Sequence, residues 1–82
     1  MANKIPTDQI IESLKTNLPP VFNRRTAQES LGNIISARTL ANLDSLKKGP
    51  PKKYLSKNVV YERDSFLEWL EARLSDREGM SL

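Results

Sequence analysis

The polar side chains of the segment 36–45 have types and a spacing that could do chemistry. If this segment is helical, Arg38 and Asn42 lie one turn apart on one face, opposite Leu40 and Leu43. Arginine and asparagine make two-pronged hydrogen bonds to guanine and adenine. An ordinary solvent-exposed face more often carries pairs of Glu and Lys. The pattern therefore predicts a helix whose outer face contacts the edges of DNA bases.

A short basic hairpin is predicted directly after this helix. Gly49-Pro50-Pro51 should end the helix. Strands are expected over residues 52–55 and 59–62, because Val and Tyr favour extended structure. Residues 56–58 would form the turn, with a positive φ at Asn58. A helix followed by a basic hairpin suits a small protein that fills a major groove and touches the DNA beside it.

The positive charge is concentrated in the middle of the chain. The net charge is +3, but residues 20–63 carry nine basic and three acidic residues, whereas residues 64–82 carry two basic and five acidic ones. Residues 1–19 have no net charge. A local basic region indicates a local anionic partner. The alternative is that these charges only form a solvated surface.

Length and composition exclude several functional classes. The chain has 82 residues, of which 38% are hydrophobic, so one small domain is expected. A domain of this size buries about 60–65% of its unfolded surface, which leaves no room for a deep substrate cleft. Cysteine and histidine are absent, which argues against disulfides, zinc sites and Ser-His triads. We therefore expect no enzyme activity, catalytic residue, metal or cofactor. Without a long apolar segment or a signal core, a cytoplasmic protein with no membrane partner is expected.

Two further helices are predicted in the first part of the chain. The first has Thr7 as its N-cap and ends before Pro19-Pro20. Its apolar stripe packs either on the domain's own core or, as a self-association surface, on a second copy of the chain. The second has Asn23 as its N-cap and ends at Gly32, which suits a left-handed C-cap. Because only residues 33–35 separate it from the next helix, the two helices should meet at a sharp angle.

Ser36 and Asp64 are the predicted N-caps of the third and the last helix. Trp69 lies at the edge of the apolar stripe of the last helix, where a core anchor is more typical than a binding residue. The members of that stripe are Phe66, Leu67, Leu70 and Leu74. The predicted organisation is an N-terminal helix with a Pro-Pro break (1–20), a domain (21–75) and a frayed tail (76–82).

Residues 21–74 resemble the MerR-like winged helix–turn–helix family, in particular the small excisionase and AlpA-type phage regulators. The resemblance rests on RTAQESLGNIISARTLANLDSLKKGPP followed by NVVYERDSFLEWL. It implies a mainly α-helical fold with a small β-hairpin, in which the second helix of a helix–turn–helix enters the major groove. The hairpin would be a basic wing over residues 52–61, and a helix with a Trp-Leu pair would close the core. The N-terminal helix is additional to this family core.

The resemblance implies a sequence-specific protein that binds double-stranded DNA. Such a protein would serve a phage or mobile element in transcription regulation or, as an excisionase-type architectural factor, in DNA recombination. Together with the residue types, it assigns Arg38, Asn42 and Ser45 to the bases. Thr39 is expected near the DNA backbone, and Lys57 in the minor groove. The residues expected on phosphates are Arg24, Arg25, Lys47, Lys48, Lys52 and Lys53.

A single module of this kind buries only about 600–1,000 Å² of protein surface on DNA, so one copy should bind modestly. We therefore expect further copies on adjacent sites, or a recombinase or integrase, as partners. The alternative is a module that binds another protein through the same fold and does not bind DNA. Salt separates the two, because phosphate contacts weaken steeply with salt and an apolar interface does not.

Overall fold

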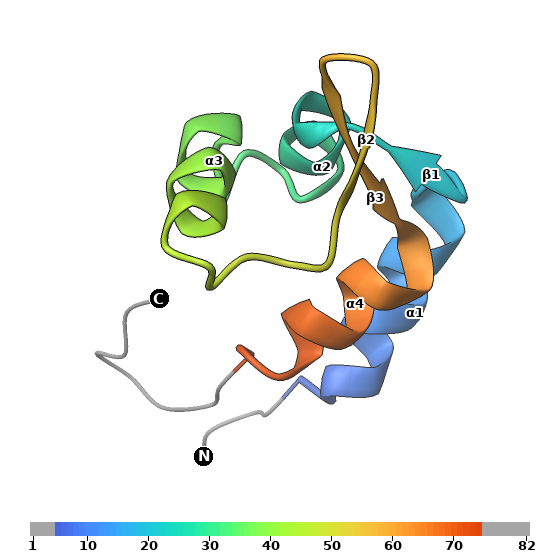
Figure 1. The fold of residues 1–82 in the computed structure, drawn as a ribbon. Helices are drawn as coiled ribbons and strands as arrows, with labels where there is room; N and C mark the ends of the chain where they lie inside the picture. Colours follow the sequence, from blue (N-terminus) through green and yellow to red (C-terminus); the bar gives the residue numbers. More distant parts are fainter. Residues whose placement is uncertain (1–4, 75–82) are drawn as a thin grey trace.

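The computed structural model describes residues 5–74, which form four helices and three short strands (Figure 1). In chain order these are α1 (Thr7–Asn17), β1 (Val21–Phe22), α2 (Arg24–Ser30), α3 (Ala37–Ser45), β2 (Lys53–Leu55), β3 (Asn58–Glu62) and α4 (Arg63–Glu71). The fold is therefore mainly α-helical, with a small antiparallel sheet. The tail predicted over residues 76–82 lies outside the described residues. None of the helices within residues 5–74 is long and apolar enough to cross a membrane.

The three strands have the order β1-β3-β2, and both pairings are antiparallel. β2 and β3 form the predicted hairpin, with Leu55 opposite Asn58. β1 pairs Phe22 with Tyr61. Periodicity does not predict this strand, because two residues are too few to show an alternating pattern. With β1 on one side and β2 on the other, both edges of β3 are paired.

The hydrophobic core lies between the sheet and the inner sides of the helices. Its largest fully buried side chains are Tyr61 of β3, Phe66 of α4 and Leu40 of α3. Leu14 of α1 and Leu18 at its C-terminal end are also buried in this core. The apolar stripe of α1 therefore packs on the domain's own core, which confirms one of the two predicted alternatives.

Side-chain caps begin α2 and α3 where the sequence predicts them. Asn23 Oδ1 accepts a hydrogen bond from the Thr26 N–H at 2.9 Å. Ser36 Oγ accepts one from the Thr39 N–H at 3.0 Å. Each bond satisfies a backbone donor that the helix itself leaves free. Local chemistry therefore fixes the starts of both helices.

The predicted caps of the other two helices are wrong. α1 begins at Thr7 itself, after Pro6, and no side chain caps it. The N-cap of α4 is Glu62, which accepts hydrogen bonds from the first free N–H groups of the helix, including that of Asp64 at 3.0 Å. These backbone bonds lower the pKa of Glu62. Because β3 runs directly into α4, Asp64 is already inside the first helical turn.

Both α2 and α3 end at a residue in the left-handed conformation. Gly32 (φ 66°) follows α2, as predicted. After α3 this residue is Lys47 (φ 60°), and the Lys48 N–H donates to the Leu43 carbonyl at 2.8 Å. This bond closes the helix before Gly49-Pro50-Pro51 is reached. The prediction that the Gly-Pro-Pro sequence ends the helix is therefore wrong.

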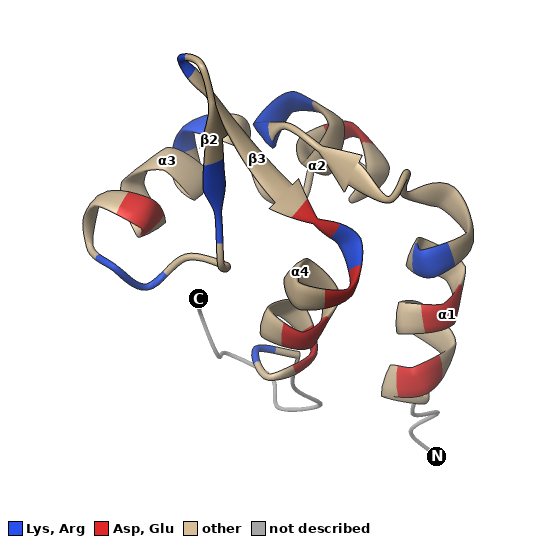
Figure 2. Cartoon of the chain, turned by 45° about the vertical axis from the view of Figure 1, so that its right-hand side comes forward, with Lys and Arg blue, Asp and Glu red and all other residues tan. Residues whose placement is uncertain are grey.

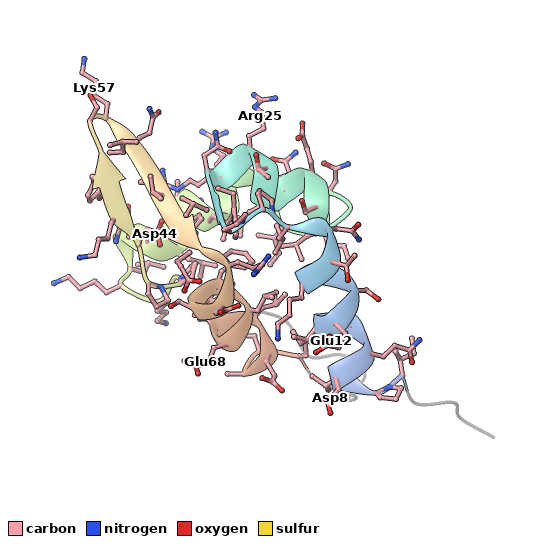
Figure 3. The ribbon with its side chains drawn as sticks, turned by 90° about the vertical axis from the view of Figure 1, so that its right-hand side faces the viewer. Asp8, Glu12, Arg25, Asp44, Lys57 and Glu68 are labelled. Atoms are coloured by element: carbon pink, nitrogen blue, oxygen red, sulfur yellow. The ribbon has the colours of Figure 1, made fainter. Side chains whose placement is uncertain are left out.

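The hairpin turn has two residues, Ser56 and Lys57, because Leu55 pairs with Asn58 across it. Asn58 thus belongs to β3, and the positive φ predicted for it is found at Ser56 instead (φ 59°). A positive φ at the first central residue alone is typical of a type II′ turn. The Lys57 side chain lies at the tip of the hairpin (Figure 3).

We predict that Ser56→Gly stabilises the protein, because glycine adopts a positive φ without the steric cost of a Cβ. The free energy of unfolding should rise by about 0.5–1 kcal/mol. Urea denaturation followed by circular dichroism measures this change. Ser13→Gly, inside α1, is the control and should lower stability by about 0.5 kcal/mol, because glycine is a poorer helix former than serine. A destabilised Ser56→Gly variant would contradict the turn conformation.

Candidate nucleic-acid interface

The outer face of α3 presents the side chains predicted to contact bases. Leu40, on the opposite face, is fully buried and turns this outer face toward solvent. Ser36 holds the first turn through the Thr39 N–H and also donates to the Thr39 hydroxyl at 3.0 Å. The exposed residues of this face are Arg38, Thr39, Asn42 and Ser45. The structure therefore places all four where a partner can reach them.

A basic hollow of about 210 Å³ lies between the start of α2 and the hairpin tip. Arg24 and Arg25 line it from α2, and Lys57 lines it from the hairpin. Figure 3 shows Arg25 and Lys57 at the same end of the molecule. The structure thus brings Lys57 close to the adjacent residues Arg24 and Arg25, although it lies far from them in the sequence.

Lys52 and Lys53 lie at the base of the hairpin rather than at its tip. Both line a second hollow, of about 250 Å³, together with Val60 and Glu62. Lys53 is exposed, whereas Lys52 is half-buried. The structure therefore separates these two lysines from the basic hollow at the tip.

The segment after α3 is held by α4. The Lys48 carbonyl accepts hydrogen bonds from Trp69 Nε1 at 2.9 Å and from Arg73 Nη2 at 2.8 Å. The Arg73 guanidinium also lies over the Trp69 ring, 4.9 Å from its centroid. Trp69 is half-buried against the core, so it is a core anchor only in part. Its second role is to fix the backbone that carries the exposed side chains of Lys47 and Lys48.

Arg24, which the sequence assigns to phosphates, has two partners inside the protein. Its Nη2 donates to Asp44 Oδ2 at 2.8 Å, and its Nε donates to the Tyr61 hydroxyl at 3.3 Å. The hydrogen bond to Asp44 raises the pKa of Arg24, and burial raises the pKa of Tyr61 to about 12. The Arg24 side chain is still 28% exposed. Arg24 therefore connects the basic hollow with the interior.

Asp44 is the residue of this region that the sequence prediction misses. It is only 9% exposed, and Tyr61 donates a hydrogen bond to it at 2.8 Å. The sequence does contain a signal, because Asp44 follows Leu40 by four residues and so continues the apolar stripe of α3. A carboxylate at a core position needs a buried donor or cation elsewhere in the chain.

Basic and acidic side chains occupy different parts of the surface. Lys and Arg gather on the start of α2, the hairpin and the segment after α3, whereas Asp and Glu are frequent on α1 and α4 (Figure 2). Asp8, Glu12 and Glu68 lie at the end opposite Arg25 and Lys57 (Figure 3). α3 and the hairpin tip both lie away from α1 (Figure 1). The outer face of α3 therefore has cations beside it and acidic helices behind it.

No protein-family model matches the chain, and no curated protein matches it. The site is therefore defined by its own residues. They form an exposed polar helix face next to a basic hairpin, and residues 5–74 around them fold into four helices and a three-stranded antiparallel sheet. This combination places hydrogen-bonding side chains and cations on the exposed surface of the same small domain.

Proposed function

We propose that the chain is a sequence-specific protein that binds double-stranded DNA through a winged helix–turn–helix. In this proposal α2 and α3 form the helix–turn–helix, and the β2–β3 hairpin forms the wing. The observation that carries the proposal is the exposed polar face of α3, with a basic hairpin beside it and acidic helices on the far side. A major groove admits one helix and offers a distinct pattern of donors and acceptors at each base pair.

The proposed contacts fall into two groups. Arg38, Asn42 and Ser45 contact base edges, and Thr39 lies near the backbone. Lys57, at the tip of the wing, reaches the minor groove or the phosphates that border it. The remaining cations position the protein on phosphates: Arg24, Arg25, Lys47, Lys48, Lys52 and Lys53. Arg24 has the smallest share of this role, because Asp44 and Tyr61 already occupy part of its guanidinium.

The proposed biological role follows the resemblance to MerR-like and excisionase-type regulators. It is that of a transcription regulator or an architectural recombination factor of a phage or mobile element. One copy offers a small interface, of about 600–1,000 Å² on the protein side. Useful specificity therefore requires several copies on adjacent sites or a partner such as a recombinase.

A module that binds another protein is the second candidate, and one observation favours it. An apolar groove lies between α1 and the turn that joins α2 to α3, lined in part by Ile5, Ile10, Leu31 and Ile34. Ile34 is 82% exposed. Exposed apolar residues that gather in a groove are typical of a protein-binding surface. Binding through this groove should depend little on salt.

Selection of binding sites from random duplex DNA tests the proposed function. The purified chain should enrich a defined sequence, and its affinity should fall steeply with salt because phosphate contacts release counterions. Repeats in the enriched sequence, and their spacing, would give the number of copies bound. Failure to enrich any sequence, together with salt-insensitive binding to a protein, would favour the second candidate.

Arg25→Gln and Lys57→Gln should each weaken binding on all duplexes about equally. Each loses one phosphate contact, so the slope of log affinity against log salt should decrease by about 1 unit. Lys15→Gln is the matched control, because it removes the same charge from α1, on the acidic side. Titrations of selected and scrambled duplexes at several salt concentrations measure the slopes. Equal changes in slope for Lys15→Gln and Arg25→Gln would contradict the proposed orientation on DNA.

A further inference from the structure

Asp44 is a buried charge on the inner side of α3, in the last turn of that helix. Its Oδ2 accepts two hydrogen bonds, from Arg24 Nη2 and from the Tyr61 hydroxyl, each at 2.8 Å. A buried carboxylate is costly unless it is paired and hydrogen-bonded. The two donors are therefore what allows a charge at this position.

The hydrogen-bonded network of Arg24, Asp44 and Tyr61 joins three elements. Arg24 is the first residue of α2, Asp44 belongs to α3, and Tyr61 lies in β3 of the hairpin. Arg24 Nε also donates to the Tyr61 hydroxyl at 3.3 Å, so each member contacts the other two. The network thus connects α3, which carries the proposed base contacts, to the hairpin, which carries the proposed backbone contacts.

Apolar packing alone does not define the orientation of α3. Leu40 and Asp44 are its buried residues. At the N-terminal end of α3, the side chain of Gln28 of α2 accepts a hydrogen bond from the Ala37 N–H at 2.7 Å. Apolar contact is not directional, so Leu40 and the half-buried Leu43 do not by themselves fix the orientation of the helix. The directional bonds of Asp44 act about 10 Å along the helix from Ala37, at 1.5 Å per residue.

Gly49 leaves the space that the Asp44 carboxylate occupies. A Cβ at position 49 would collide with Asp44 Oδ1, so any other residue there would require the Asp44 side chain to move. Within residues 5–74, Oδ1 is buried and accepts no hydrogen bond. The carboxylate is therefore held through Oδ2 alone. The loss of one donor should directly weaken the attachment of α3 to the rest of the domain.

We propose that Asp44 is a positioning residue for DNA discrimination. Through Arg24 and Tyr61 it fixes the orientation of α3 relative to the hairpin. Both elements can then contact the same duplex at the same time. This inference rests on the proposed DNA-binding function. Bidentate base contacts need a defined geometry, whereas contacts to the repeating phosphates carry no sequence information. Loss of the network should therefore lower discrimination more than general affinity.

Tyr61→Phe is the principal test, because it removes one hydroxyl from the network and leaves the ring in the core. Asp44→Asn keeps the shape of the side chain and removes its charge. Neither substitution removes a cation or a proposed DNA contact. Ser65→Ala is the matched control. It also removes one hydroxyl hydrogen bond, from Ser65 Oγ to Glu62 at 2.9 Å, but at the start of α4.

Amide hydrogen exchange of the free protein gives the first readout. In Tyr61→Phe, exchange in α3 should be about 10-fold faster, because a hydrogen bond to a charged group is lost, while exchange in α4 should stay within about 2-fold. The ratio of affinities for the selected and a scrambled duplex, at fixed salt, gives the second readout. It should fall about 10-fold, with little change on the scrambled duplex. Asp44→Asn should also speed exchange in α3 and lower the ratio of affinities, although loss of the negative charge beside Arg24 should raise the affinity for both duplexes. Ser65→Ala should change neither readout.

The proposal is overturned if Tyr61→Phe retains the parent's exchange in α3 and the parent's discrimination. It is also overturned if exchange rises equally in α3 and α4, because that result shows a purely structural role. If Asp44→Asn does not fold, Tyr61→Phe decides alone. If the parent itself does not discriminate between the duplexes, the DNA-binding proposal fails, and exchange in α3 still decides whether Asp44 holds the helix.

Discussion

Phe66→Ala is expected to lower the free energy of unfolding by about 3–5 kcal/mol, a large part of the stability of a small domain. Phe66 is fully buried. Its ring centroid lies 5.1 Å from that of Phe22, 5.5 Å from that of Tyr61 and 5.7 Å from that of Trp69. The ring therefore joins α4 to β1 and β3, and its removal leaves a cavity at their junction. Urea denaturation followed by circular dichroism measures the loss.

Phe66→Leu is the control, because it retains most of the apolar volume and should cost less than about 1.5 kcal/mol. Trp69→Ala should cost about 1–3 kcal/mol, less than a fully buried indole would, since Trp69 is half-buried. A Phe66→Ala variant as stable as the parent would contradict the packing of the three elements around this ring.

The N-caps of the helices show which features local sequence can predict and which it cannot. Asn23 and Ser36 are correct N-caps because a short polar side chain can accept the N–H three residues on. The same rule fails at Asp64, because β3 continues into α4 and Glu62 reaches the free N–H groups first. The sequence contains both candidates, and the point where β3 ends decides between them.

Long-range pairing explains the features that the sequence does not predict. β1 has two residues and exists because β3 pairs with it 39 or more residues later in the chain. The contacts of Asp44 with Arg24 and Tyr61 span 20 and 17 residues. No local pattern specifies such partners. The outer face of α3, in contrast, follows from helical periodicity alone, and its predicted residues are exposed in the structure.

Arg38→Ala and Asn42→Ala should each lower the affinity for the selected duplex by about 1–3 kcal/mol, the discrimination that one bidentate base contact provides. Both side chains are exposed and lie one turn apart, opposite the buried Leu40. Each substitution should also relax the preference at one base position. Arg38→Ala should weaken general binding as well, because it removes a cation, whereas Asn42 is neutral.

The measurement that tests base contact by α3 most directly compares Asn42→Ala with the parent on the selected and on a scrambled duplex at one salt concentration. Asn17→Ala, an exposed residue at the end of α1, is the matched control. We predict a loss of about 5-fold or more on the selected duplex, no loss on the scrambled one, and no effect of Asn17→Ala. If Asn42→Ala binds both duplexes as the parent does, the outer face of α3 does not contact bases.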